Sequence, residues 1–238
     1  MRDPYLYEDA PVIKNKGGIK DAEMLKKAEG DITQYSMSIV YGTKFSKFDT
    51  ATLCEIHRII FGDIYEFAGK FRTIQMTKPE IVLGGDTVRY SNPGDIKNDL
   101  SSVFKEITKL KSVKAKKETL FRLVRITASI WQIHPFREGN TRAVISFSLL
   151  LAASHGIELN YEIFKKHAAY VRNALVWCCQ GIYSKFEYLE KIYYDAAGIL
   201  EAPDDLKNKT ETKDYTVVNG HYVADYKEIP HEYDDNGK

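Results

Sequence analysis

A short polar loop between two strongly apolar segments constrains the fold of this chain more than any other feature. Residues 120–133 read LFRLVRITASIWQI and residues 143–153 read AVISFSLLLAA, with HPFREGNTR between them. A helix that is apolar on every side has to be buried by other elements. The two segments therefore predict a pair of central helices, and the polar loop that joins them is the first candidate for a functional site.

The rest of the chain supplies further helices to cover this pair. Apolar residues at helical spacing, with Asp21 and Asp49 or Thr50 as caps, predict helices at 22–40, 50–62, 96–110, 116–133, 140–154, about 161–180 and about 184–198. One stretch breaks the pattern: Arg72–Met76 and Val88–Tyr90 are β-like arms around a Gly84-Gly85-Asp86 turn. We interpret it as a β-hairpin, with an irregular surface connection as the alternative. The predicted class is an all-α bundle with one small hairpin.

Length and composition limit the organisation and the partners of the chain. The 238 residues favour one domain over 1–200, with a core at about 45–198 and a helical extension at about 20–40. The tail, 201–238, has ten acidic and five basic residues, and is expected to be flexible or to form a small hairpin near 215–224, where Asn219-Gly220 lies between β-like arms.

A net charge of +1 argues against bulk binding to nucleic acid or to an acidic membrane. No run reaches the roughly 18 apolar residues that a membrane-spanning helix needs. Three cysteines and the lack of a secretory leader favour a reducing, cytoplasmic location.

The loop residues have chemistry in common with phosphate sites. If Asn140 or Thr141 begins the second apolar helix, its first N–H groups can hold an anion, and Gly139 lets that anion approach closely. Arg142 in the first turn conflicts with the helix dipole unless an anion lies nearby. Glu138 is a suitable oxygen ligand for Mg²⁺, and His134 can accept a proton near neutral pH.

Other phosphate and metal motifs are missing. The chain has no G-x-x-x-x-G-K-[ST] and no G-x-G-x-x-G sequence. His134 lacks a second histidine at zinc spacing. Cys178 and Cys179 lie in an apolar context that favours packing over a role as nucleophile.

The loop resembles the signature of the Fic family, H-x-F-x-[DE]-G-N-G-R-x-x-R. His134, Phe136, Glu138, Gly139, Asn140 and Arg142 match it. The segments NKGGIKDAEMLKKAE and IHRIIFGDIYEFAGKFRT are also similar to Fic sequences, so the resemblance covers about residues 12–198. It implies an all-helical fold and the transfer of AMP from ATP to a Tyr, Ser or Thr hydroxyl of a target protein.

The resemblance also implies roles for individual residues. His134 is the base that deprotonates the target hydroxyl, and Glu138 is the Mg²⁺ ligand. The nucleotide site is formed by Phe136, Arg137, Gly139, Asn140, Thr141 and Arg142. The flap that aligns the target is formed by Ile74, Gln75 and Met76. Tyr183 is a candidate neighbour of the adenine ring, although a tyrosine packed in the core is the more common explanation and is the expectation here.

Two positions depart from the signature: Thr141 replaces a glycine, and Ile145 replaces the second arginine. Transfer of another phosphate-linked group, UMP or phosphocholine, and a catalytically weak protein-binding module therefore remain alternatives. The inhibitory pattern of many relatives, [ST]-x-x-x-E-[GN], is absent because Leu25 precedes Glu29-Gly30, and Glu29 is interpreted as a solvated helix residue. This favours restraint by a separate antitoxin-like protein, as in a toxin–antitoxin pair, with the tail or a homo-oligomer as other possibilities.

Overall fold

The computed structural model describes residues 3–110, 115–199 and 215–223. In this part of the chain there are eight α-helices, two 3-10 turns and one two-stranded sheet. The helices are α1 (Ala22–Gly42), α2 (Thr50–Phe61), α3 (Ile96–Leu110), α4 (Lys116–Ile133), α5 (Asn140–Ser154), α6 (Tyr161–Lys166), α7 (Ala168–Cys178) and α8 (Glu187–Ala196). The 3-10 turns are η1 (Ile81–Leu83) and η2 (Gly181–Tyr183), and the strands are β1 (Val217–Val218) and β2 (His221–Tyr222).

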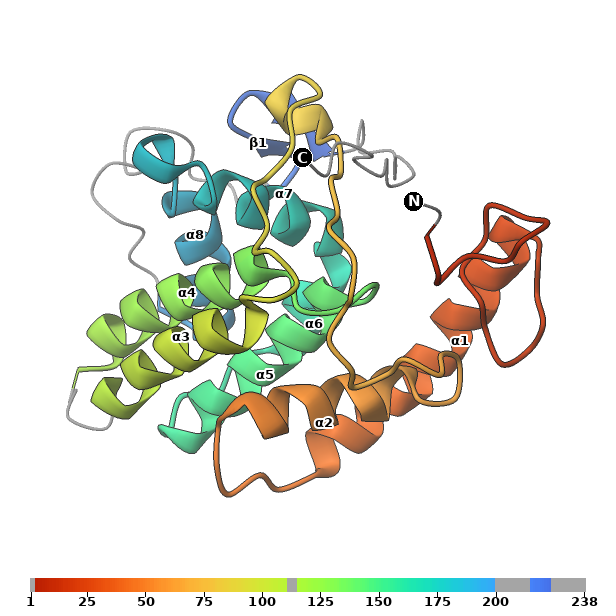
Figure 1. Cartoon of the computed structure of the whole chain (residues 1–238). Coiled ribbons are helices and arrows are strands. Elements are labelled where there is room, and N and C mark those ends of the chain that lie inside the picture. The colour runs from red at the N-terminus through yellow and green to blue at the C-terminus, as the bar shows by residue number, and fades with distance from the viewer. Residues whose placement is uncertain (1–2, 111–114, 200–214, 224–238) are drawn as a thin grey trace.

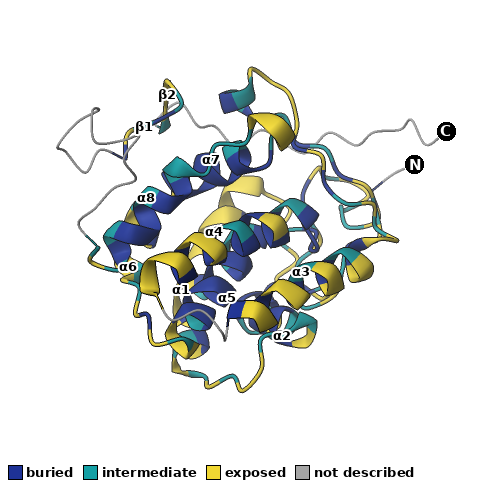
Figure 2. Ribbon diagram, turned by 90° about the vertical axis from the view of Figure 1, so that its left-hand side faces the viewer, coloured by how far each residue is buried: buried dark blue, intermediate teal, exposed yellow. Residues whose placement is uncertain are grey.

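Helix α5 lies at the centre of the bundle. It is in contact with α1, α2 and α4, while α3 packs on α4 and α7 packs on α8 (Figure 1). Buried residues gather along α5, α7 and α8, and exposed residues face outward from the peripheral helices (Figure 2). The central apolar helix pair predicted from the sequence is present, with bounds that match the prediction at 116–133 and 140–154.

Local side-chain caps fix where the first two helices begin. The carboxylate of Asp21 accepts a hydrogen bond from the backbone N–H of Met24 at 2.7 Å. The carboxylate of Asp49 accepts one from the N–H of Thr52 at 3.0 Å. Each bond satisfies a donor that the helix itself leaves without a partner. No helix in the described residues is long and apolar enough to cross a membrane.

Three predicted elements are corrected by the structure. The single helix expected at about 161–180 is two helices, α6 and α7, because the backbone at His167 leaves the helical region with φ −112° and ψ 35°. The helix expected from about 184 begins at Glu187, after the η2 turn. The arms Arg72–Met76 and Val88–Tyr90 are extended but are not strands.

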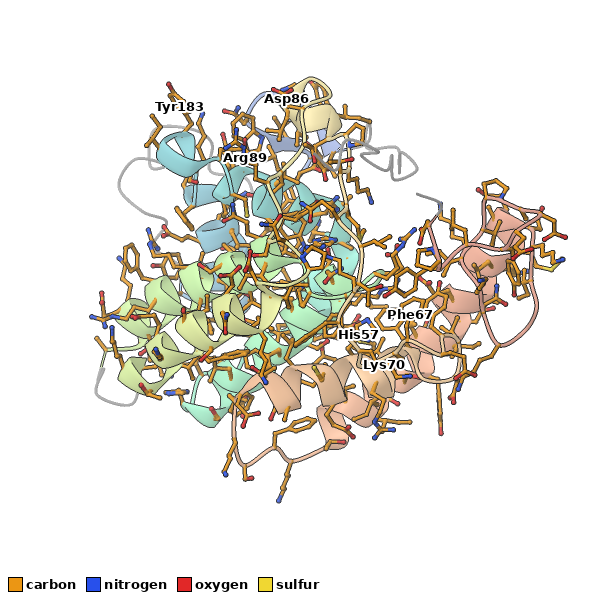
Figure 3. The ribbon with its side chains drawn as sticks, viewed as in Figure 1. His57, Phe67, Lys70, Asp86, Arg89 and Tyr183 are labelled. Atoms are coloured by element: carbon orange, nitrogen blue, oxygen red, sulfur yellow. The ribbon has the colours of Figure 1, made fainter. Side chains whose placement is uncertain are left out.

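We call residues 72–91 the flap segment. Its two arms are joined by one isolated bridge, between Pro79 and Thr87, and its tip carries the η1 turn. Outside this bridge, Arg72–Met76 and Val88–Tyr90 do not pair as strands, because carbonyls of Ile74 and Ser91 bind the Arg72 side chain, as described below. In Figure 1 the flap segment runs from the end of α2 across the face of the bundle, and Figure 3 places Asp86 of its tip at the top edge.

The two-stranded sheet lies in the C-terminal part of the chain. Val217 pairs with Tyr222 and Val218 with His221, around an Asn219–Gly220 turn in which both residues have positive φ. This is the hairpin that the Asn-Gly signal predicts. The side chain of Val218 is fully buried, and β1 is in contact with α7. The remainder of the predicted tail lies outside the described residues.

Candidate active site

The active-site loop (residues 134–139) turns sharply between α4 and α5. His134 ends α4 with φ +52°, and Gly139 precedes α5 with φ +77°. A Cβ atom at position 139 would lie 2.2 Å from the Phe61 ring, so glycine is required there by space as well as by conformation. The loop therefore folds back over the positive end of the central helix, whose first N–H groups lack helical partners.

Two hydrogen bonds between the Asn140 side chain and the Phe136 backbone hold the loop in its conformation. The Asn140 side chain accepts a hydrogen bond from the Phe136 N–H at 2.9 Å and donates one to the Phe136 carbonyl at 2.8 Å. The Phe136 side chain is fully buried, so it anchors the loop in the core. The amide of Asn140 is thus committed to shaping the loop.

His57 of α2 supports the loop and was not predicted as a site residue. One ring nitrogen, Nδ1, accepts a hydrogen bond from the Gly69 N–H at 2.9 Å, so the other, Nε2, donates to the Glu138 carbonyl at 2.9 Å. Its ring stacks on Phe136 with 3.8 Å between centroids. Burial lowers the pKa of His57 to about 4, so its ring is neutral near pH 7.

Arg72 ties the loop to the flap segment and was also missed as a site residue. Its Nε donates to the His134 carbonyl at 2.7 Å and its Nη1 to the Ile74 carbonyl at 2.7 Å. Its Nη2 donates to the carbonyl of Ser91. The guanidinium is buried and binds carbonyls of both flap arms, which is why the arms do not need to pair with each other.

The flap segment covers His134. The Tyr90 ring stacks on the His134 ring with 4.1 Å between centroids, and His134 is only 6% exposed. The tip of the flap is fixed by an ion pair between Glu80 and Arg172 of α7, at 2.5 Å, in which the Glu80 side chain is 1% exposed. Beside Tyr90, a hollow of about 420 Å³ is bounded by Arg89, Ser91, Asp99 and Gln132.

Glu29 of helix α1 contacts the start of α5. Glu29 forms an ion pair with Arg142, and its other carboxylate oxygen accepts a hydrogen bond from the Tyr65 hydroxyl. Thr33 accepts a further bond from Arg142 at 3.0 Å. Burial, and secondarily Glu29, raise the pKa of Tyr65, so its hydroxyl stays a donor. The interpretation of Glu29 as a solvated residue is wrong, because its side chain is 14% exposed and engaged with Arg142.

The remaining predicted residues occupy different environments. Arg137 is buried and forms an ion pair with Asp3 at 2.8 Å. Glu138 is half-buried at the start of α5, and one of its carboxylate oxygens accepts from the Gly139 N–H at 2.9 Å. The Thr141 hydroxyl accepts a hydrogen bond from the Trp131 indole at 2.9 Å. All of these side chains lie in or beside the loop.

The predicted flap residues alternate in exposure. Ile74 is half-buried, Gln75 is exposed and Met76 is 1% exposed. Tyr183 is 73% exposed and points outward from the molecule (Figure 3), so the expectation of a core tyrosine is wrong.

Burial defines the environments of Ile145 and of the two adjacent cysteines. Ile145 is 6% exposed and lines a cavity of about 190 Å³ with Met37, Arg142, Phe164 and Val171. Cys178 and Cys179 are buried, and burial raises the pKa of both thiols. They pack in the core, as their apolar sequence context predicts.

Similarity to known proteins identifies the architecture. Residues 47–152 match the model of the Fic/DOC family. This part of the chain is a Fic/DOC domain. The Fic resemblance of the loop and the predicted fold class are thereby confirmed. The match covers α2 to α5, so it includes the flap segment and the whole active-site loop.

Curated relatives of this Fic domain are protein adenylyltransferases. One from Bartonella henselae is 28% identical over 183 residues, which are 72% of this chain and 34% of that protein. The protein adenylyltransferase VbhT of Bartonella schoenbuchensis is 29% identical over 164 residues, 67% of this chain and 33% of that protein. The chain spans about a third of the length of these two relatives. A probable protein adenylyltransferase Fic of Salmonella typhimurium is 27% identical over 163 residues, 68% of this chain and 78% of that protein.

Solved structures of bacterial effector proteins share the fold. The type IV secretion system effector BepA superposes with a TM-score of 0.68 at 24% identity, over 81% of this chain and 67% of that one. BepC of Bartonella tribocorum, solved with bound AMPPNP, has a TM-score of 0.68 at 22% identity, over 81% of this chain and 95% of that one.

Proposed function

We propose that this chain is a protein adenylyltransferase that transfers AMP from ATP to a hydroxyl side chain of a target protein. The observation that carries the proposal is the placement of His134 and Glu138 in one loop at the positive end of α5, with Arg142 in the first turn of the same helix. A base, an acid and an anion-binding helix start are the parts that phosphoryl-group transfer needs. The adenylyltransferase relatives support the same reaction.

In this mechanism the imidazole of His134 accepts the proton of the target hydroxyl. The hydroxyl oxygen then forms a bond to the α-phosphorus of ATP, and the bond from that phosphorus to the bridging oxygen breaks. Pyrophosphate leaves with the bonding electrons. The N–H groups at the start of α5 and the Arg142 guanidinium neutralise the charge on the phosphates. The Arg72 bond to the His134 carbonyl keeps the ring in position.

Glu138 is the residue that would hold Mg²⁺. The described residues contain no group of three or more acidic, histidine or cysteine side chains that could hold a metal, and Glu138 is the one carboxylate of the loop 134–139. That fits Mg²⁺, which is commonly held by one or two carboxylates together with substrate phosphates. When bound, the ion would neutralise part of the negative charge on the phosphates.

The target hydroxyl has to reach His134 past Tyr90. The hollow beside Tyr90, with the charged side chains of Arg89 and Asp99 on its wall, provides the approach for the target segment. Ile74, Gln75 and Met76 lie on the opposite arm, where the exposed backbone near Gln75 can pair with an extended target. The target is a protein with an accessible Tyr, Ser or Thr hydroxyl.

A second donor is worth testing because of Ile145. The cavity that it lines is largely apolar, and Arg142 and Lys165 are the only cations among its lining residues, so it offers few partners to a terminal phosphate. Transfer of phosphocholine from CDP-choline, which has no γ-phosphate, would then replace transfer of AMP; transfer of UMP from UTP is the other alternative. We also propose a cytoplasmic location, from the cysteine content, and restraint by an antitoxin-like protein, from the Fic resemblance. Co-purification with the product of a neighbouring gene tests that restraint.

Labelling with ATP tests the main proposal. ATP carrying label at the α- or the γ-phosphate is incubated with Mg²⁺, lysate and the wild-type or His134→Ala protein. Protein labelling from the α-label alone, lost in His134→Ala, is the expected result. Labelling from the γ-label alone would mean phosphorylation and would overturn the proposal. Labelling only with UTP or CDP-choline would establish the second candidate instead.

A further inference from the structure

The segment before α1 reaches the active-site loop. We call residues 3–15 the N-terminal arm, which folds back on itself through an isolated bridge between Leu6 and Ile13. The N–H of Tyr7 donates to the carbonyl of Val12 at 3.0 Å. Figure 1 shows the arm looping around the start of α1 at the edge of the bundle. It lies outside the matched Fic/DOC residues, 47–152.

Asp3 of this arm forms the most deeply buried ion pair of the described residues. Its Oδ2 accepts hydrogen bonds from the Arg137 guanidinium, at 2.8 Å from Nη2 and 3.2 Å from Nε. The two side chains are 0% and 2% exposed. The other carboxylate oxygen, Oδ1, accepts from the Tyr5 N–H at 2.8 Å. Burying two charges is favourable only with geometry and hydrogen bonds of this quality.

The same arm also holds the base of the flap segment. The Tyr5 hydroxyl accepts a hydrogen bond from the Thr73 N–H at 3.1 Å and lies 3.2 Å from the Thr73 hydroxyl. Its ring packs edge-on against Phe67 with 5.2 Å between centroids. Thr73 follows Arg72, whose side chain binds the His134 carbonyl. One short arm therefore contacts the two segments that surround His134.

We propose that Asp3 is a positioning residue for the transferase reaction, acting through Arg137. This inference rests on the proposed function. Arg137 sits between the buried Phe136 and the acid Glu138, so the position of its guanidinium sets the path of the loop. The loop carries positive φ at His134, a conformation that persists in a side-chain-bearing residue only where the surroundings impose it. The N-terminal arm supplies part of that constraint, and Arg137 serves the loop rather than the nucleotide.

Asp3→Asn tests the role, because it keeps the shape of the side chain and removes its charge. Asp9→Asn is the matched control: Asp9 is an exposed acid of the same arm, paired with Lys20 at the surface. Turnover is measured at a temperature at which circular dichroism shows every variant to be folded. We expect kcat to fall roughly 10- to 100-fold in Asp3→Asn, since small misplacements of reacting groups cost rates of this order. The KM for ATP changes less, because α5 itself holds the phosphate site.

A double variant separates positioning from stability. Asp3→Leu with Arg137→Met replaces the buried pair by apolar side chains, which commonly restores stability. We expect this variant to melt near the wild type and to keep the low kcat. If kcat in either Asp3 variant lies within twofold of Asp9→Asn under folding conditions, the proposal is wrong.

Hydrogen exchange tests the same inference without any enzymatic activity. We expect the backbone amides of residues 136–140 to exchange at least tenfold faster in Asp3→Asn than in Asp9→Asn. Equal exchange rates in the two variants would overturn the positioning role. A wild-type protein that transfers no AMP would refute the proposed function alone, and the exchange measurement would still decide whether the arm holds the loop.

Discussion

The ion pair between Glu29 and Arg142 leads to the sharpest prediction. Arg142 is the cation at the start of α5, and Glu29 already occupies it, together with Thr33. Any phosphate that binds to Arg142 has to displace the Glu29 carboxylate or share the guanidinium with it. We expect Glu29→Gln, which keeps the size of the side chain and removes its charge, to bind ATP more tightly than the wild type.

The structure sets the size of the effect. Hydrogen bonds to charged groups contribute about 1.5–3 kcal/mol when well shielded. The Glu29 side chain is 14% exposed and that of Arg142 is 34% exposed, so solvent reduces this contribution to roughly 1–2 kcal/mol. Since about 1.4 kcal/mol corresponds to tenfold in affinity, the Kd for ATP should fall about 5- to 30-fold.

Isothermal titration calorimetry with AMPPNP and Mg²⁺ measures the change without turnover. Glu23→Gln is the control, because Glu23 is an exposed acid in the first turn of the same helix. Tyr65→Phe removes one of the bonds that hold Glu29 and should give a smaller gain in affinity. An unchanged or higher Kd in a well-folded Glu29→Gln protein would show that Glu29 does not compete with the phosphates.

Three other predictions follow from single features. Gly139→Ala should lower the free energy of unfolding in urea by about 2–4 kcal/mol, from left-handed strain and the clash with Phe61; Gly156→Ala, with φ +72° and open space, should lose only the strain part. His57, with its pKa near 4 in the fold, takes up a proton more readily when unfolded, so stability should fall by roughly 3 kcal/mol as the pH drops from 6.5 to 4. Thermal unfolding in the presence of a metal chelator should show this loss of stability between pH 6.5 and 4 in the wild type and not in His57→Gln. Burial raises the pKa of the Cys54 thiol to about 11, so its modification at pH 8 should be about 100-fold slower than that of free cysteine. A native protein modified as fast as free cysteine would contradict that environment.

The sequence by itself determined the elements whose signals are local. The central helices, α4 and α5, begin and end as predicted, because apolar periodicity and the glycine of the loop act within a few residues of each boundary. The Asn219–Gly220 turn is found for the same reason. The candidate loop was identified because its polar residues are consecutive in the chain.

Only the tertiary structure decided how that loop is held. Asp3 and Arg137 are 134 residues apart in sequence, and Glu29 and Arg142 are 113 apart. No local pattern marks either pair, since each acid looks like a solvated residue until the helices pack. The flap arms were mistaken for strands for a related reason: their backbone groups bind Arg72 and the loop, which the sequence cannot show. Chemistry that lies in one stretch can be read from the chain, whereas the side chains that position and restrain it are brought together by packing alone.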